Sequence, residues 1–268
     1  MIAGKELIIF DLGTGVRNLG ATLKAPTRAN IFVTHYHYDH IQGLPFFGPV
    51  FDPQNEITIH GPTRDGRNVK NVILDQMQQP FFPITADMAF RAQIEYRAFK
   101  AGDRFESNGV CVTAIETKHP GGCLAYRLDY QNRSIVYATD TEQGETDKHL
   151  IAFARGADLL ICDAMYTEDE YLGRTGSSKI GWGHSTWESA VQIGAAADVK
   201  TLVLFHHDPS RSDAAIDRLL RLHKKIRKNI VAAREGLVFH FKTTRASAPA
   251  NRSPRERSSM SVSKMRPK

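Results

Sequence analysis

The sequence predicts one α+β domain, residues 1–242, followed by a basic tail, residues 243–268. Short apolar runs typical of strands alternate with segments whose apolar residues have helical spacing. Histidines and aspartates recur at the carboxyl ends of the predicted strands. Apolar residues make up 41% and charged residues 24% of the chain, which is ordinary for a globular protein with a full core.

The net positive charge of the chain is confined to its C-terminal segment. The formal net charge is +6, and residues 243–268 contain seven basic residues and one acid, so this segment carries the whole excess and residues 1–242 sum to zero. Few of its residues are large and apolar, so we predict a disordered tail. Nucleic acid or an anionic surface could bind such a tail, although most basic tails are only solvated.

The sequence also bears on the compartment. It contains no apolar run of the ~18–20 residues that would span a bilayer, so we expect no membrane partner. Its three cysteines, at positions 111, 123 and 162, are odd in number and lack paired spacing, which favours a reducing environment. We therefore expect a cytoplasmic protein.

The order of predicted elements runs as follows. Strands are expected at residues 7–10, 30–34, 56–60, 94–99, 110–116, 124–130, 134–139, 158–162, 201–205 and 236–241. Helices are expected at residues 16–24, 64–78, 148–155 and 211–228, with another running from near residue 184 to residue 197. Gln131-Asn132 is expected to turn a hairpin between two of the strands.

The densest chemical signal is Thr34-His-Tyr-His-Tyr-Asp-His40, which follows an apolar strand. Successive side chains of an extended segment point to opposite faces, so His35 and His37 share one side. Asp39 and His40 fall on the following turn, where they can serve a second metal. Isolated histidines on loops are common, but four ligand-type residues among six consecutive positions at a strand end favour a metal site.

This His-x-His-x-Asp-His motif resembles the signature of the metallo-β-lactamase-fold hydrolases. The resemblance implies a four-layer αββα sandwich with two metal ions at the edge shared by its two sheets. Asp11, in an Asp-x-Gly-x-Gly turn, would then lie beneath the metals in a supporting role. Members usually have one or two more strands before this turn, and only ten residues precede Asp11 here. We therefore expect the fold without its usual first strand or strands.

The resemblance assigns the remaining ligands. His35, His37 and His119 would bind one metal, Asp39, His40 and a late histidine the other, and Asp140 would bridge both. The late histidine is expected to be His206, directly after a strand, with His207 as the alternative. Imidazoles and carboxylates without a thiolate suit Zn²⁺, with Mn²⁺ or Fe²⁺ as alternatives.

Two further features favour the phosphodiesterase branch of this superfamily. Many zinc β-lactamases have a cysteine where Asp140 falls, whereas a bridging aspartate is typical of the phosphodiesterases and the glyoxalase II-like thioesterases. Gly-His184-Ser-Thr resembles a motif of the tRNase Z branch, in which a histidine faces the phosphate with support from an acid, here Asp163. The resemblance implies Asp39 and His184 as catalytic residues, with Asp163 as the third by its order along the chain.

The sequence thus predicts a metal-dependent hydrolase that cleaves a phosphodiester by attack of a metal-bridging hydroxide. The near-zero charge of residues 1–242 and the lack of a long tRNA-gripping insertion favour a small substrate. A cyclic nucleotide, a cyclic phosphoribosyl ester or a short oligonucleotide would fit, as in the PhnP-like and cyclic-nucleotide phosphodiesterase-like branches. Relatives are often dimers, so the resemblance permits a homodimer.

Two alternative functions and one structural question stay open at this stage. The first is a glyoxalase II-like thioesterase or another ester hydrolase, which would not require His184. The second is a non-catalytic metal-binding signalling domain. The third concerns Phe81-Phe82, between two prolines, which either pack in the core or form a wall of the substrate cleft.

Overall fold

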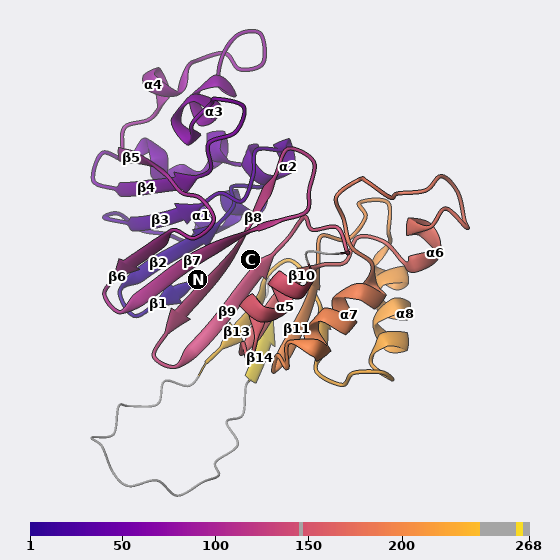
Figure 1. The fold of residues 1–268 in the computed structure, drawn as a ribbon. Helices are drawn as coiled ribbons and strands as arrows, with labels where there is room; N and C mark the ends of the chain where they lie inside the picture. Colours follow the sequence, from indigo (N-terminus) through magenta and orange to yellow (C-terminus); the bar gives the residue numbers. More distant parts are fainter. Residues whose placement is uncertain (145–146, 242–260, 265–268) are drawn as a thin grey trace, which may run out of the picture.

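Two β-sheets form the centre of the molecule (Figure 1). The computed structural model describes residues 1–144, 147–241 and 261–264. In the first sheet the strand order is β1-β2-β3-β4-β5, and all neighbours except β1 and β2 are parallel. Its strands are β1 (Ile2–Ala3), β2 (Glu6–Phe10), β3 (Arg28–Phe32), β4 (Glu56–Gly61) and β5 (Gln93–Ala98).

The second sheet has the order β12-β11-β10-β9-β8-β7-β6. Strands β6 to β9 pair antiparallel, and β9 to β12 pair parallel. The strands are β6 (Arg104–Ser107), β7 (Val110–Thr117), β8 (Cys123–Tyr130), β9 (Arg133–Ala138), β10 (Leu159–Asp163), β11 (Thr201–Phe205) and β12 (Ile230–Ala232).

Helices cover the outer face of each sheet (Figure 1). The first sheet is accompanied by α1 (Gly15–Gly20), α2 (Tyr38–Ile41), η1 (Leu44–Phe46), η2 (Gly48–Phe51), α3 (Val69–Asp75) and α4 (Ala86–Ala89). The second is accompanied by α5 (Asp147–Ala154), α6 (Glu168–Tyr171), α7 (Trp187–Ala196) and α8 (Asp213–His223).

Alternating side chains divide the core into layers. In β3, Phe32 faces the second sheet and packs with Tyr126 of β8, whereas Ile31 packs on the opposite side with Ile73 of α3. On the other flank, Leu204 of β11 packs among α7 residues that include the fully buried Trp187. Because successive side chains of a strand point to opposite faces, each sheet buries both surfaces. The order helix, sheet, sheet, helix confirms the predicted four-layer αββα sandwich.

Several predicted elements needed correction. The helix expected at residues 64–78 spans only Val69–Asp75, and that expected at 211–228 spans Asp213–His223. Short strands β1, β6 and β12 and helices α4 and α6 were not predicted, because elements of two to four residues carry little periodicity. The hairpin at Gln131-Asn132 is confirmed, since β8 and β9 pair antiparallel around it.

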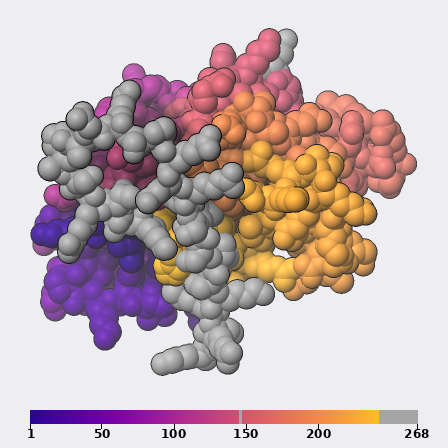
Figure 2. Space-filling model, turned by 90° about the horizontal axis from the view of Figure 1, so that it is seen from below, coloured from indigo at the N-terminus to yellow at the C-terminus, as the bar shows by residue number. Residues whose placement is uncertain are grey.

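The C-terminal region is only partly described. β13 (Leu237–His240) pairs antiparallel with β14 (Ser261–Lys264). Within residues 243–268, which were predicted to be a disordered tail, the structure describes only the four residues of β14. The rest of that prediction lies outside the described residues. Among the described helices none is long and apolar enough to cross a membrane. Figure 2, from below, shows the N-terminal half in indigo and purple beside the C-terminal half in orange and yellow.

Candidate metal centre

The carboxyl ends of the strands bring the predicted ligands to one edge of the molecule. The ligand-bearing segments follow β3, β7, β9 and β11, and Asp163 is the last residue of β10. In an open parallel sheet the carboxyl ends of the strands are where ligands bind. Asp11, Asp140 and His206, which follow β2, β9 and β11 within two residues, adopt the left-handed region with φ of 59°, 48° and 56°. This conformation is uncommon for residues other than glycine, and it occurs disproportionately at functional sites.

Three overlapping groups of possible metal ligands converge at this edge. Within each group, one ligand atom per residue lies within 4.8 Å of every other. The first group contains His35, His37, His119 and Asp140, the second Asp39, His40, Asp140 and His206, and the third Asp140, Asp163, His184 and His206. All the residues predicted from the sequence to be ligands or catalytic groups are therefore brought together.

Asp140 joins the first two groups through different oxygens. Its Oδ2 lies 3.5 Å from Nε2 of His35 and 3.8 Å from Nε2 of His119. Its Oδ1 lies 3.2 Å from Nε2 of His40 and 3.4 Å from Nε2 of His206. The carboxylate is 1% exposed, so neither oxygen is free to turn toward solvent. One side chain thus presents one oxygen to each group, as a bridging ligand would.

The chemistry of these side chains fits a divalent cation. Nε2 of His35 and Nε2 of His40 are buried and have no hydrogen-bond partner among the described residues. A buried nitrogen without a partner is costly, and a metal ion would satisfy both. Nε2 of His206 lies 3.1 Å from Oδ2 of Asp39, which adds a carboxylate to the second group. Imidazole and carboxylate together suit divalent ions such as Zn²⁺.

The electrostatics of the site also favour a cation. Burial and the neighbouring His40 lower the pKa of His35 to about 2. Burial opposes protonation of His40 as well, but the hydrogen bond and charge of Asp11, together with the carboxylates of Asp140 and Asp39, raise the pKa of His40 to about 12. Contacts with His206 and His40 hold the pKa of Asp39 far below its ordinary value. The carboxylates thus concentrate negative charge around His40, and metal binding there would release its proton.

Asp11 supports the second group from beneath. Its Oδ2 accepts a hydrogen bond from Nδ1 of His40 at 2.9 Å and one from the hydroxyl of Tyr137 at 3.1 Å. Its Oδ1 accepts from the backbone amide of Thr34 at 2.7 Å. A carboxylate on the far nitrogen of a ligating imidazole fixes the ring's tautomer and orientation. Asp11 is in none of the three ligand groups, so its placement fits the expected supporting role.

The two late histidines are distinguished by their neighbours. His206 directs Nε2 toward Asp39 and Asp140. His207 belongs to none of the three groups, and its ring stacks on Trp187 with centroids 5.3 Å apart. The geometry therefore favours His206 as the ligand over His207.

His184 and Asp163 form a separate pair beside the metal ligands. Nδ1 of His184 donates to Oδ2 of Asp163 at 2.9 Å and lies 4.0 Å from Oδ2 of Asp140. Asp163 is fully buried and also accepts from the backbone amides of Met165 at 3.0 Å and Thr141 at 3.3 Å. The Asp163 carboxylate is thus held in place and binds Nδ1 of His184, which leaves Nε2 of that ring available to another group.

The sequence did not reveal the role of Glu142. This carboxylate is 1% exposed, and its Oε1 accepts from the hydroxyl of Tyr171 and from the amide of Gly181, each at 2.6 Å. It therefore anchors the loop that leads to His184. The only available signal was an acid two residues after Asp140, and its partners lie 29 and 39 residues away.

The loop before His184 also touches the first ligand group. Nδ1 of His119 donates to the backbone carbonyl of Gly183 at 2.9 Å. Thr186 caps the helix that follows, α7, and its side chain accepts from the amide of Ser189. The Glu188 carboxylate in the first turn of this helix accepts from the amide of Glu168.

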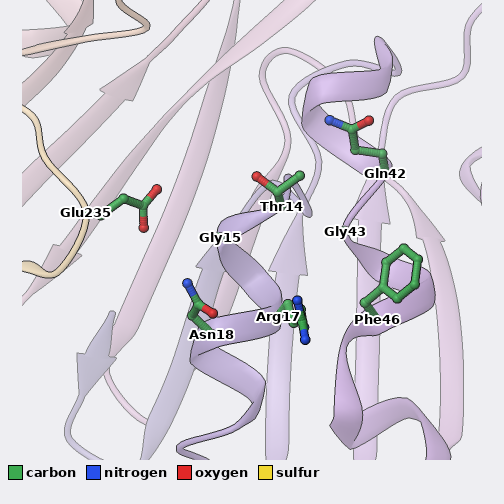
Figure 3. Close-up of a pocket in the computed structure, with 8 residues that line it drawn as sticks. All are labelled: Thr14, Gly15, Arg17, Asn18, Gln42, Gly43, Phe46 and Glu235. Atoms are coloured by element: carbon green, nitrogen blue, oxygen red, sulfur yellow. The ribbon is translucent and has the colours of Figure 1, made fainter. Parts of the chain in front are cut away.

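Two cavities lie near this edge. One, of about 450 Å³, is lined by Thr14, Arg17 and Asn18 around α1, by Gln42 and Phe46 in the segment after α2, and by Glu235 on a separate loop (Figure 3). None of its lining residues belongs to the three ligand groups. The other, of about 390 Å³, is lined in part by Tyr36 and Tyr38, which alternate with ligands along the chain.

An αββα sandwich with histidines and aspartates gathered at the edge shared by its sheets is a protein of the metallo-β-lactamase fold. The chain belongs to the family described as "Beta-lactamase superfamily domain", whose model matches residues 8–207. This confirms the resemblance inferred from the motif at positions 35 to 40.

Individual proteins are similar over most of the chain. A ribonuclease Z of Clostridium tetani is 24% identical over 233 residues, which cover 68% of this chain and 72% of that protein. The metallo-β-lactamase-fold protein YhfI of Bacillus subtilis superposes with a TM-score of 0.65 at 20% identity, covering 87% of this chain and 86% of that one. A diphosphatase of the PhnP family superposes with a TM-score of 0.64 at 18% identity, covering 89% and 81%.

Proposed function

We propose that this chain is a metal-dependent hydrolase that cleaves small phosphodiesters. The observation that carries the proposal is Asp140, whose two oxygens face two separate groups of ligands. Metal pairs roughly 3.5–4 Å apart clamp the attacking and leaving oxygens of an in-line displacement, as phosphodiester cleavage requires. The similarity to ribonuclease Z and to a diphosphatase of the PhnP family supports this class of reaction.

Each ligand group would hold one ion. His35, His37, His119 and Asp140 would bind the first, and Asp39, His40, His206 and Asp140 the second. Zn²⁺ fits these donors, with Mn²⁺ and Fe²⁺ as the alternatives. When bound, the ions would lower the pKa of a water and neutralise phosphate charge.

His184 would act on the phosphate itself. Because Nδ1 donates to Asp163, Nε2 is directed elsewhere and can hydrogen-bond a phosphoryl oxygen or transfer a proton at the leaving oxygen. Asp163 would hold the imidazole in this tautomer and stabilise its protonated form. A thioesterase of this fold would not require the pair, which is why the pair favours phosphodiester chemistry.

The substrate would be small and nucleotide-like. Residues 1–242 carry no net charge, whereas binding of a long polyanion relies on many cationic contacts. The relatives named ribonuclease Z cleave RNA, so a phosphodiester of a nucleoside is the nearest small equivalent. The cytoplasmic location and a homodimer stay predictions from the sequence.

The test combines metal analysis with two substrates. Purified wild type, His184→Ala and a control, His149→Ala on the exposed face of α5, would be assayed on bis(p-nitrophenyl) phosphate and on an acyl thioester. We expect His184→Ala to lose about 10²–10⁴-fold in phosphodiester hydrolysis with its metal retained. The control should match wild type. Thioester hydrolysis alone, or a lack of bound metal, would contradict the proposal.

A further inference from the structure

The cavity of about 390 Å³ is lined in part by the ligand-bearing loop. Tyr36 and Tyr38 of that loop line it, together with Ile41 at the end of α2. Its far wall comes from Val72 and Gln76 at α3 and from Phe81 in the loop that follows. Along the chain, Tyr36 and Tyr38 alternate with His35, His37 and Asp39, so the cavity and both ligand groups share one loop.

Two aromatic rings stand at the mouth of the cavity. Tyr38 is 74% and Phe81 79% exposed, among the most exposed large apolar side chains of the described residues. Of the two possibilities for Phe81, packing in the core is therefore excluded, and its ring forms part of the cavity wall. Ile41, at 3% exposed, forms part of the apolar floor. Exposed aromatic rings over an apolar floor are the usual lining of a ligand pocket.

Gln76 adds a directional polar group. The nitrogen of its side-chain amide is buried and has no hydrogen-bond partner in the part of the chain that the structure describes. A buried amide without a partner is costly, and a ligand in the cavity would satisfy it. A glutamine amide both donates and accepts, so it matches the hydrogen-bonding edge of a heterocycle.

We propose that this cavity binds the base of a nucleoside phosphodiester. The base would stack on Phe81 and Tyr38 and hydrogen-bond with Gln76, while its phosphate lies at the ligand groups. Stacking on aromatic side chains is how proteins hold single bases with little sequence preference. This inference rests on the proposed phosphodiesterase function and narrows its substrate to those that carry a base.

Kinetics on a pair of esters tests the base preference. The chromogenic esters thymidine 5′-(p-nitrophenyl phosphate) and methyl p-nitrophenyl phosphate share a leaving group, and only the first has a base. We expect wild type to favour the thymidine ester in kcat/KM. Phe81→Ala should reduce the ratio of the two kcat/KM values by about five- to a hundredfold. Tyr38→Ala and Gln76→Leu should reduce it as well.

The matched control is Phe51→Ala, because Phe51 is a partly exposed phenylalanine on η2 that does not line this cavity. In Phe51→Ala the ratio of the two kcat/KM values should equal that of wild type. A ratio unchanged in Phe81→Ala, or changed equally in Phe51→Ala, would overturn the inference.

Calorimetric binding separates this inference from the proposed function. Adenosine 5′-monophosphate and ribose 5-phosphate would be titrated into wild type and Phe81→Ala. Tighter binding of the nucleotide by wild type, with the preference lost in the variant, supports the base pocket even if neither ester is hydrolysed. Equal affinities for the two ligands would overturn the base pocket, even if both esters are hydrolysed.

Discussion

Nδ1 of His184 lies 2.9 Å from Oδ2 of Asp163, a carboxylate that is fully buried at the end of β10. Two backbone amides, of Met165 and Thr141, hold the same carboxylate in place. The pair therefore has a fixed geometry before any substrate arrives. The distance of 4.0 Å from His184 Nδ1 to Asp140 places this ring beside the metal ligands. A rigid imidazole in this position would be suited to act on a phosphate if the proposed metals are bound.

The first prediction concerns Asp163→Asn. The variant has nearly the same shape, but its amide group would face Nδ1 of His184 and favour the other tautomer of the ring. We expect kcat for phosphodiester hydrolysis to fall about 10²–10⁴-fold with bound metal unchanged. The buried amide would cost about 1–3 kcal/mol of stability, which thermal unfolding would measure. Full activity in a folded Asp163→Asn protein would show that the pair has no catalytic importance.

The second prediction distinguishes His206 from His207. Nε2 of His206 faces Asp39 and Asp140, whereas His207 stacks on Trp187. We expect wild type to bind about two metal ions per chain and His206→Ala about one, because the first ligand group does not use His206. His207→Ala should keep its full metal content and only lose stability. Elemental analysis after dialysis would measure both, and metal loss in His207→Ala alone would reverse the assignment.

Much of the site could be predicted because it lies where strands end. His35, His119, Asp140 and His206 each lie within three residues of the end of a strand, and the carboxyl ends of these strands meet at one edge. The local sequence was therefore enough to locate the candidate ligands. The four-layer fold was predicted from the same motif, because the motif resembles that of a known superfamily. The family model matches residues 8–207, which is most of the chain.

The parts that could not be predicted depend on contacts between distant segments. Glu142 meets Gly181 across 39 residues, and neither position carries a local signal of the other. The cavity near Phe81 likewise needs α2 and α3 to be placed side by side, which periodicity does not specify. Strands of two to four residues, such as β6, are stabilised by their sheet neighbours rather than by their own sequence.

The third prediction concerns Gly183→Ala. A Cβ at Gly183 would lie 2.2 Å from Nδ1 of His119 and 2.4 Å from Cδ of Pro120, so His119 must move. Since this contact orients a ligating ring, we expect metal affinity to fall about 10–100-fold, measured by competition with a chelator. Gly181→Ala is the control, because Gly181 has a similar φ of 85° but nothing within 4 Å of its Cβ. Equal losses in both variants would attribute the effect to backbone strain alone.

The fourth prediction concerns the pH dependence of stability, and it rests on His60. This side chain is 2% exposed, stacks on Phe32 at 4.4 Å between ring centroids, and has Nε2 3.1 Å from Oδ1 of Asn30. It belongs to none of the ligand groups, so its placement fits a structural role. Burial and the nearby Arg97 lower its pKa from 6.5 to about 4.

The direction of the effect follows from this lowered pKa. As the pH falls through 6.5, His60 takes up a proton in the unfolded chain, whereas in the folded protein it stays neutral until about pH 4. Its stabilising contribution is therefore complete above pH 6.5 and is lost between pH 6.5 and 4. We expect the drop in unfolding free energy from pH 7 to pH 5, measured with urea, to be smaller in His60→Gln than in wild type. An identical drop in both proteins would show that His60 does not titrate as its burial requires.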